Sequence, residues 1–366
     1  MIFLLLALLA DAQASQKSSP SAGFASLSRQ AEVARDNHRL DDALKLYRQA
    51  LQLNPRWAEG WFYLGTIFYD RDQFLEASAA FVKSTQYAPE NSVPWAFLGL
   101  SEYGTGDYAK ALQHLLKAKG MGIGLGDRVG ESVRFRLATL LTKFEQYEAA
   151  MDLFGEYAKR GDDTARVLEA TGIAALRMPL LPSELPIEKK PLALQVGRAM
   201  FETGMRKEAS ALAMFEQIVQ QYPDVPNIHY LYGTFLLRVP GDRGIEQLKK
   251  EIEISPKHVP ARLQIAFEYI KRSDFATGLP FAREATEIAP DSFVAWNALG
   301  RLQTGLGQHE EAVKSLEKAV ELAPESPETR FALATAYARV GRNEDAARER
   351  AKFLKLKSPV KKTEEP

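Results

Sequence analysis

The chain has 366 residues, 47 basic and 47 acidic side chains, and no cysteine. The balanced charge gives no overall field that would attract nucleic acid or an anionic membrane surface. The lack of cysteine excludes disulfides, thiolate zinc sites and cysteine nucleophiles.

The first element in chain order is an apolar run. Residues 2–10 read IFLLLALLA, and two small-x-small triplets follow, as at a signal peptidase site. The run is too short to cross a bilayer. We expect a signal peptide over residues 1–14, a flexible lead-in over 15–23, and export to a bacterial periplasm or the extracellular space without lasting membrane insertion. A wrongly assigned start or a buried leading helix, with a cytoplasmic location, is the alternative.

A phrase of 34 residues recurs along most of the chain. Pro55 and Pro89 are 34 residues apart, and so are the neighbours in the series Pro256, Pro290 and Pro324. Each proline follows an amphipathic stretch that it stops from continuing as a helix. Two such stretches joined by a glycine-containing turn cannot bury their apolar stripes alone, so the phrases are expected to stack on one another.

The repeated residues resemble those of the tetratricopeptide repeat, whose pattern is W-x2-L-G-x2-Y followed by A, F, A and P. The match over residues 58–89 consists of Trp61, Leu64, Gly65, Phe68, Ala77, Phe81 and Pro89. Gly65, Gly99 and Gly300 fall where the first helix should closely approach the second. The resemblance implies an all-α, right-handed superhelical solenoid of helix-turn-helix repeats with about nine units.

An N-terminal array is expected over residues 24–161. It holds about four repeats, which begin near residues 24, 58, 92 and 131, and a glycine-rich loop over 119–127. This loop lacks the spacing of a phosphate-binding loop, and no predicted strand precedes it. We interpret it as a connection between repeats.

The repeat register breaks over residues 162–191. A single irregular helix is predicted over 164–177, and residues 178–191 contain four prolines in fourteen residues, which predicts an extended linker. About five further repeats are expected over 192–357. The last has Arg350 where other units carry an apolar residue, as the polar face of a terminal repeat requires. The charged tail over 358–366 is predicted to be disordered.

No catalytic motif accompanies the repeats. The five histidines are dispersed, and H-E-x-x-H, G-x-S-x-G and Walker-type sequences are absent. The repeats take up almost the whole chain between 24 and 357, which leaves no space for a catalytic domain. We predict a protein that is not an enzyme, with no catalytic residues, cofactor or metal. An unrecognised site in the groove is the remaining alternative.

The resemblance also implies where a partner binds, because first helices line the concave face in the tetratricopeptide family. Aromatic side chains there can anchor a protein or peptide, and arginine can bind its carboxylates. The alternative is that the aromatics are packing residues and the arginines are solvated. Asn297 and Arg301 do not reproduce the carboxylate clamp for a chaperone's acidic C-terminus. The transferred positions are Phe62, Thr66, Tyr69, Leu100, Tyr103, Phe135, Phe267, Lys271, Asn297, Arg301, Phe331 and Arg339.

These observations favour a scaffold or adaptor that binds a protein or peptide, and not nucleic acid, in the groove of the repeats. The alternative function rests on the apolar leader. It is an exported factor that assembles a bacterial envelope or carries polysaccharide or outer-membrane proteins. The sequence indicates no oligomeric state.

Overall fold

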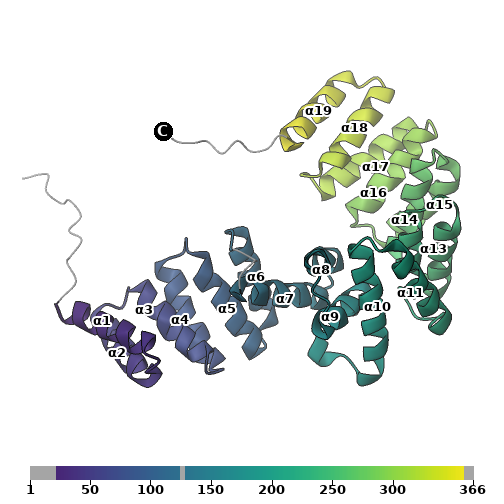
Figure 1. Cartoon of the computed structure of the whole chain (residues 1–366). Coiled ribbons are helices and arrows are strands. Elements are labelled where there is room, and N and C mark those ends of the chain that lie inside the picture. The colour runs from purple at the N-terminus through teal and green to yellow at the C-terminus, as the bar shows by residue number, and fades with distance from the viewer. Residues whose placement is uncertain (1–21, 124–127, 358–366) are drawn as a thin grey trace, which may run out of the picture. The chain divides into compact units, whose positions relative to one another are not determined.

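The computed structural model describes residues 22–123 and 128–357. The expected signal peptide, residues 124–127 of the glycine-rich loop and the tail lie outside the described residues. In the described part, the regular structure is nineteen α-helices and two short 3-10 helices, without a strand (Figure 1). The expectation of an all-α fold is confirmed. The chain divides into unit 1, residues 1–153, and unit 2, residues 154–366.

Unit 1 is a series of helical hairpins in which α1 packs on α2, α3 on α4 and α5 on α6, and α4 also packs on α5 of the next hairpin. The first helix begins at Ala22, inside the expected lead-in. The helices are α1 (Ala22–Asp36), α2 (Leu40–Leu53), α3 (Ala58–Tyr69), α4 (Phe74–Tyr87), α5 (Ser92–Thr105), α6 (Tyr108–Gly120), α7 (Arg128–Lys143) and α8 (Tyr147–Arg160), whose second half belongs to unit 2.

Unit 2 also consists of hairpins, and its last three pairs pack on one another in series. With α9 set aside, the described helices form nine pairs in chain order, the number of repeats expected. Those that follow α8 are α9 (Ala165–Ala175), α10 (Lys190–Gly204), α11 (Glu208–Gln221), α12 (Ile228–Leu236), α13 (Arg243–Ile254), α14 (Val259–Lys271), α15 (Phe275–Ile288), α16 (Phe293–Gly305), α17 (His309–Leu322), α18 (Pro327–Arg339) and α19 (Asn343–Lys357).

Small residues set the distance between the two helices of a repeat, as expected. A Cβ atom added at Gly300 would lie 2.5 Å from Leu316 Cγ and 3.2 Å from the carbonyl oxygen of Ala312. At Gly65 the same atom would lie 2.7 Å from the Phe81 ring. At these two positions a side chain would collide with the second helix, so the close approach there requires glycine.

The residue at the repeat's tryptophan position forms a hydrogen bond in addition to its apolar contacts. Trp61 Nε1 donates to the carbonyl oxygen of Pro55 at 2.8 Å, and so holds the turn between two repeats. Any side chain that places an N–H at this position can donate the same bond, so a different donor can replace tryptophan. The same bond, six residues after the proline, joins Trp95 to Pro89, His229 to Pro223, Trp296 to Pro290 and Arg330 to Pro324.

The proline-rich segment differs from the extended linker that the sequence predicts. It forms two 3-10 helices, Pro182–Glu184 and Ile187–Lys189, between which Leu185 is buried. Proline is compatible with the first turn of a helix, where its missing N–H is not needed. Pro191 accordingly lies in the first turn of α10.

Two glycines bring α9 and α10 into backbone contact. A Cβ atom at Gly172 would lie 1.8 Å from the carbonyl oxygen of Ala193, and one at Gly197 would lie 1.9 Å from that of Leu168. Helix α9 is therefore not a separate irregular element. It is packed into unit 2 as closely as the helices of a repeat.

A buried polar network joins α9, α12, α13 and α14 in unit 2. Glu251, which is fully buried, accepts the backbone N–H of Asn227 at 2.9 Å. The Asn227 amide donates to the carbonyl oxygen of Leu176, and its oxygen accepts from His258 Nε2 at 2.9 Å. His258 Nδ1 accepts the backbone N–H of Ala261 and caps α14, so the imidazole is neutral with its proton on Nε2.

Candidate partner-binding groove

A groove of about 520 Å³ lies on unit 2 among α14, α15, α16, α18 and α19. Figure 1 shows α16 to α19 side by side. Its volume is in the range of ligand-binding pockets. The apolar lining residues are Ile270, Phe275, Phe331, Ala332 and Phe353, and the charged ones are Arg301, Glu328 and Lys357.

Phe331 is the most prominent apolar side chain of this groove. It is 54% exposed, and its ring centroid lies 5.3 Å from that of Phe353 on α19. Large aromatic side chains are usually much more buried than this in a folded domain. The pair therefore presents a strip of apolar surface that water covers in the free protein.

An ionic contact holds α19 against α18 behind this strip. Arg330 Nη1 donates to Glu349 Oε2 at 2.5 Å, and Lys352 donates to the other oxygen at 2.8 Å. Burial alone would raise the pKa of Glu349, but the hydrogen bonds from Lys352 and Arg330 lower it below its usual value. The carboxylate is thus kept charged, and it fixes the helix that carries Phe353.

Two cations of the groove lack a carboxylate partner within the described part of the chain. Arg301 is exposed, with its guanidinium carbon 5.9 Å from the centroid of the Phe267 ring. Lys357 Nζ lies 5.3 Å from the centroid of the Phe353 ring. Glu328 is the one carboxylate that lines the described groove, and its place in the first turn of α18 suits a negative charge.

Of the positions predicted to bind a partner, Arg301 and Phe331 are brought together in this groove. Phe267 lies under Arg301, whereas Lys271 is exposed beside Glu268 at 3.4 Å. Asn297 is only 6% exposed and donates to Thr329 Oγ1, so it holds α16 to α18. Arg339 is exposed at the end of α18.

On the first helices of unit 1, the predicted partner-binding positions are occupied by packing residues. Phe62 and Tyr69 on α3 both contact the Phe97 ring on α5, with centroid separations of 5.6 and 5.5 Å. Burial raises the pKa of Tyr69 above its ordinary value. Thr66 is half-buried and donates to the carbonyl oxygen of Tyr63. These side chains pack repeats together.

The remaining predicted positions of unit 1 are also largely occupied by packing. Leu100 is 2% exposed and Phe135 is 7% exposed. Tyr103 is half-buried, with the Arg136 guanidinium carbon 5.5 Å from its ring centroid. A partner-binding role of these residues stays a prediction.

Sequence reasoning missed the part of the groove that comes from outside the first helices. Phe275 begins α15, and Phe353 and Lys357 are on α19, the second helix of its repeat. The family resemblance places partner-binding residues on first helices alone, so it does not indicate these three residues. The spacing of Phe353 and Lys357, one helical turn apart, is the signal that could have indicated them.

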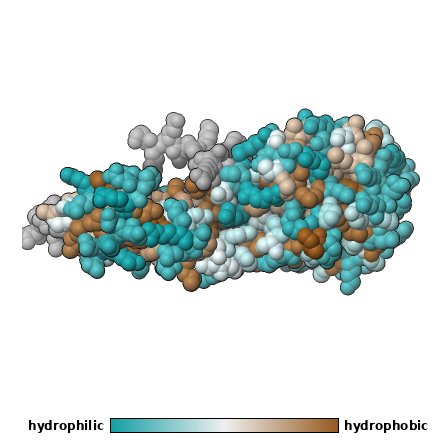
Figure 2. Space-filling view, turned by 60° about the horizontal axis from the view of Figure 1, so that its bottom comes forward, coloured by the Kyte–Doolittle hydropathy of each residue, from teal (hydrophilic) through white to brown (hydrophobic). Residues whose placement is uncertain are grey.

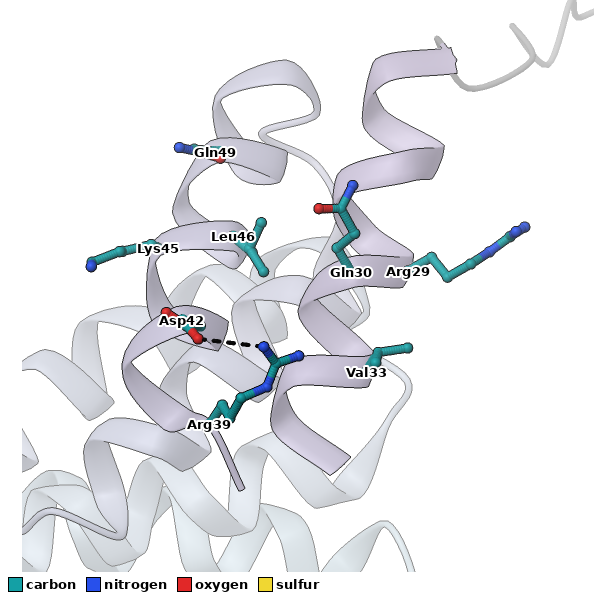
Figure 3. Close-up of a pocket in the computed structure, with 8 residues that line it drawn as sticks. All are labelled: Arg29, Gln30, Val33, Arg39, Asp42, Lys45, Leu46 and Gln49. Carbon is teal, nitrogen blue, oxygen red and sulfur yellow. Dashed lines mark ion pairs between the residues drawn. The ribbon is translucent and has the colours of Figure 1, made fainter. Parts of the chain in front are cut away.

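A second pocket, of about 460 Å³, lies between α1 and α2 in unit 1. Figure 3 shows Leu46 and Gln30 towards the space between the helices, and Arg29 and Lys45 extending away from it. Arg39 is paired with Asp42 at 3.7 Å. Six of its eight lining residues are polar or charged, and none of the eight is aromatic.

The described surface outside these two pockets is mixed in character. On the face in Figure 2, hydrophobic residues appear as groups between hydrophilic ones. Within residues 22–123 and 128–357, no three histidine, aspartate or glutamate side chains gather as metal ligands would. None of the helices described is both long and apolar enough to cross a membrane. The absence of catalysis stays a prediction.

Comparison with known proteins gives matches to three repeat models. Residues 28–89 and 193–224 match models described as tetratricopeptide repeat, and residues 300–341 match one described as TPR repeat. A BBSome complex member BBS4 homolog of Drosophila melanogaster is 22% identical over 296 residues, which cover 76% of this chain. The chain spans 60% of the length of that relative.

Solved structures are similar at low identity. MamA from Desulfovibrio magneticus RS-1 is 22% identical with a TM-score of 0.41, over 44% of this chain and 93% of that one. Yeast Tom70 is 15% identical with a TM-score of 0.38, over 91% of this chain and 85% of that one. The family matches coincide with helical hairpins of the structure in both units. The chain is therefore a tetratricopeptide repeat protein.

Proposed function

We propose that this protein is a scaffold that binds a segment of another protein in the groove of unit 2. The observation that carries the proposal is the 54% exposure of Phe331 at the edge of that groove. Burying a phenylalanine side chain contributes about 1.5–3 kcal/mol, and such anchors supply most of the energy of an interface.

The architecture supports this role. A repeat array offers extended surfaces made of successive helices, and its units can change their exposed residues without changing the packed ones. The Drosophila relative is named as a member of a complex. A role in holding proteins together is in keeping with that name, and it needs neither a cofactor nor a metal.

We also propose that the protein is exported, because residues 2–10 and the small residues after them have the composition of a signal peptide. This proposal is independent of the groove. N-terminal sequencing of the mature product tests it, and the expected first residue is close to Gln13 or Ser15. A product that retains Met1 would refute export and, with it, the function as a carrier in the bacterial envelope.

Photo-cross-linking in the source organism tests the scaffold function. Benzoylphenylalanine placed at Phe331 should give an adduct with a polypeptide partner upon irradiation. The matched control places it at Leu75 of α4, which is 74% exposed and distant in sequence from the groove. An adduct at position 331 alone is expected. Absence of a polypeptide adduct at 331, or equal adducts at both positions, would contradict the proposal.

A further inference from the structure

We propose that the occupant of this groove is an acidic peptide segment that carries a large apolar side chain. The apolar side chain lies against Phe331 and Phe353, and neighbouring carboxylates of the partner pair with Arg301 and Lys357. This inference rests on the proposed scaffold function and specifies the chemistry of its partner.

The walls of the groove indicate that the partner carries a large apolar side chain. Phe275 from α15, Phe331 from α18 and Phe353 from α19 line one volume of about 520 Å³. Since each ring comes from a different helix, the space between them is bounded on several sides. An aromatic or leucine side chain would be desolvated there, which is the arrangement of an interface anchor.

The cations of the groove indicate that the partner is acidic. Arg301 and Lys357 line the groove, and neither forms an ion pair with a carboxylate among residues 22–123 and 128–357. Phe331, Thr335 and Arg339 are spaced four residues apart on α18, so a third cation continues the same face of that helix. Arg339 also has no ion pair within the described residues. A basic segment would meet these cations unfavourably.

The pocket between α1 and α2 provides an internal contrast. Its Arg39 pairs with Asp42, whereas Arg29 and Lys45 have no ion pair among the described residues, so the contrast rests on the absence of aromatic rings from its walls. Of the two described pockets, only the groove of unit 2 combines cations that lack a carboxylate partner with exposed aromatic rings. Guanidinium is the cation best suited to bind a carboxylate with two hydrogen bonds.

Three synthetic peptides with blocked termini test the inference on the full-length protein. They are DDFFDD, its charge-reversed counterpart KKFFKK, and DDSSDD, which lacks the apolar side chains. Binding is followed by isothermal titration up to about 1 mM peptide. We expect DDFFDD to bind about tenfold more tightly than either of the others, and to weaken as NaCl is raised because the charges are exposed.

Two surface variants show whether binding occurs at the proposed place. Arg301→Glu should weaken DDFFDD about tenfold and strengthen KKFFKK, and Phe331→Ser should weaken both peptides. The matched controls are Arg283→Glu on the exposed surface of α15 and Leu75→Ser on α4, and both should bind as the unmodified protein does. Circular dichroism establishes that all four variants remain folded.

The outcomes separate this inference from the scaffold function. Equal or tighter binding of KKFFKK to the unmodified protein overturns the acidic partner, and so does an Arg301→Glu variant without effect. If peptide binding still depends on Phe331 in those cases, the scaffold function remains supported. No binding of any peptide overturns the inference, while the scaffold function is decided by the cross-link at position 331.

Discussion

Phe62 in unit 1 and Phe331 in unit 2 occupy the same position of the repeat, one residue after Trp61 and Arg330, respectively. Phe62 is half-buried, with Phe81 of its own repeat and Phe97 of the next at centroid distances of 5.9 and 5.6 Å. Phe331 has only Phe353 as an aromatic neighbour in the described part and is 54% exposed.

The difference shows that exposure is decided by the neighbouring repeat and not by the residue itself. In unit 1, α5 follows α3 and covers the ring of Phe62. The described residues end with α19, so a further first helix does not cover Phe331 there. The same repeat position is therefore a packing position in α3 and a solvent-exposed one in α18.

The largest effects are expected where the two units are alike. Ala77 and Ala312 are both fully buried between the helices of a repeat. Ala77→Trp and Ala312→Trp should each lower the free energy of unfolding by about 3 kcal/mol, because the larger ring forces the helices apart. Urea denaturation measures both. Unchanged stability of either variant would mean that the repeat register is wrong.

The next prediction compares the stability lost when the equivalent phenylalanine is removed from unit 1 and from unit 2. Phe62→Ala removes contacts with two rings and should cost about 2 kcal/mol. Phe331→Ala should cost no more than about 0.5 kcal/mol, because the side chain is mostly in water. The same denaturation experiment compares them. Equal losses would show that Phe331 is a packing residue.

The stability of unit 2 is expected to depend on pH. Burial lowers the pKa of His258 to about 4, and the charges of Arg177 and Arg262 act in the same direction. The unfolded state therefore binds the proton first as the pH falls below about 6.5, and stability is lost from there down to about 4. Between pH 7 and pH 5 the loss should be roughly 1–2 kcal/mol.

His258→Asn is the control for this effect. Asparagine keeps an oxygen that can cap α14 but does not titrate. In unit 1 the cap of α5 is already an asparagine, Asn91, which accepts the backbone N–H of Val93. The variant should therefore lose less stability than the unmodified protein over the same pH interval. An identical pH dependence would assign the loss to other groups.

The last prediction concerns the hydrogen bond that recurs in both units. Trp61→Phe and Trp296→Phe retain an aromatic ring but remove the N–H that bonds to Pro55 and Pro290. Each should lower the free energy of unfolding by about 1 kcal/mol. A similar cost in the two units would show that the repeat uses the same chemistry in both.

Much of this fold was predictable because the repeat is visible as a spacing. Prolines 34 residues apart and the small residues Gly65 and Gly300 indicate where helices end and approach. The folding of the proline-rich segment was not predictable, because proline both ends helices and begins them. The backbone contact of α9 with α10 depends on Gly172, a glycine outside the repeat pattern.

The groove was predictable only in part. Arg301 and Phe331 follow from their positions in the repeat, but the same rule also selects Leu100 and Asn297, which are buried. Repeat position tells which face a residue is on. Whether water or another helix covers that face depends on tertiary contacts that the spacing does not contain. Phe353 lines the groove because of such a tertiary contact.

One repeat position is half-buried under neighbouring rings in unit 1, at Phe62, and open to solvent in unit 2, at Phe331. The chain contains no cysteine, so Phe62→Cys and Phe331→Cys each introduce a single thiol whose reaction with a disulfide reagent can be timed in the folded protein. We predict rapid labelling at position 331 and markedly slower labelling at position 62 until the protein is unfolded. Equal labelling rates at the two positions would contradict the account.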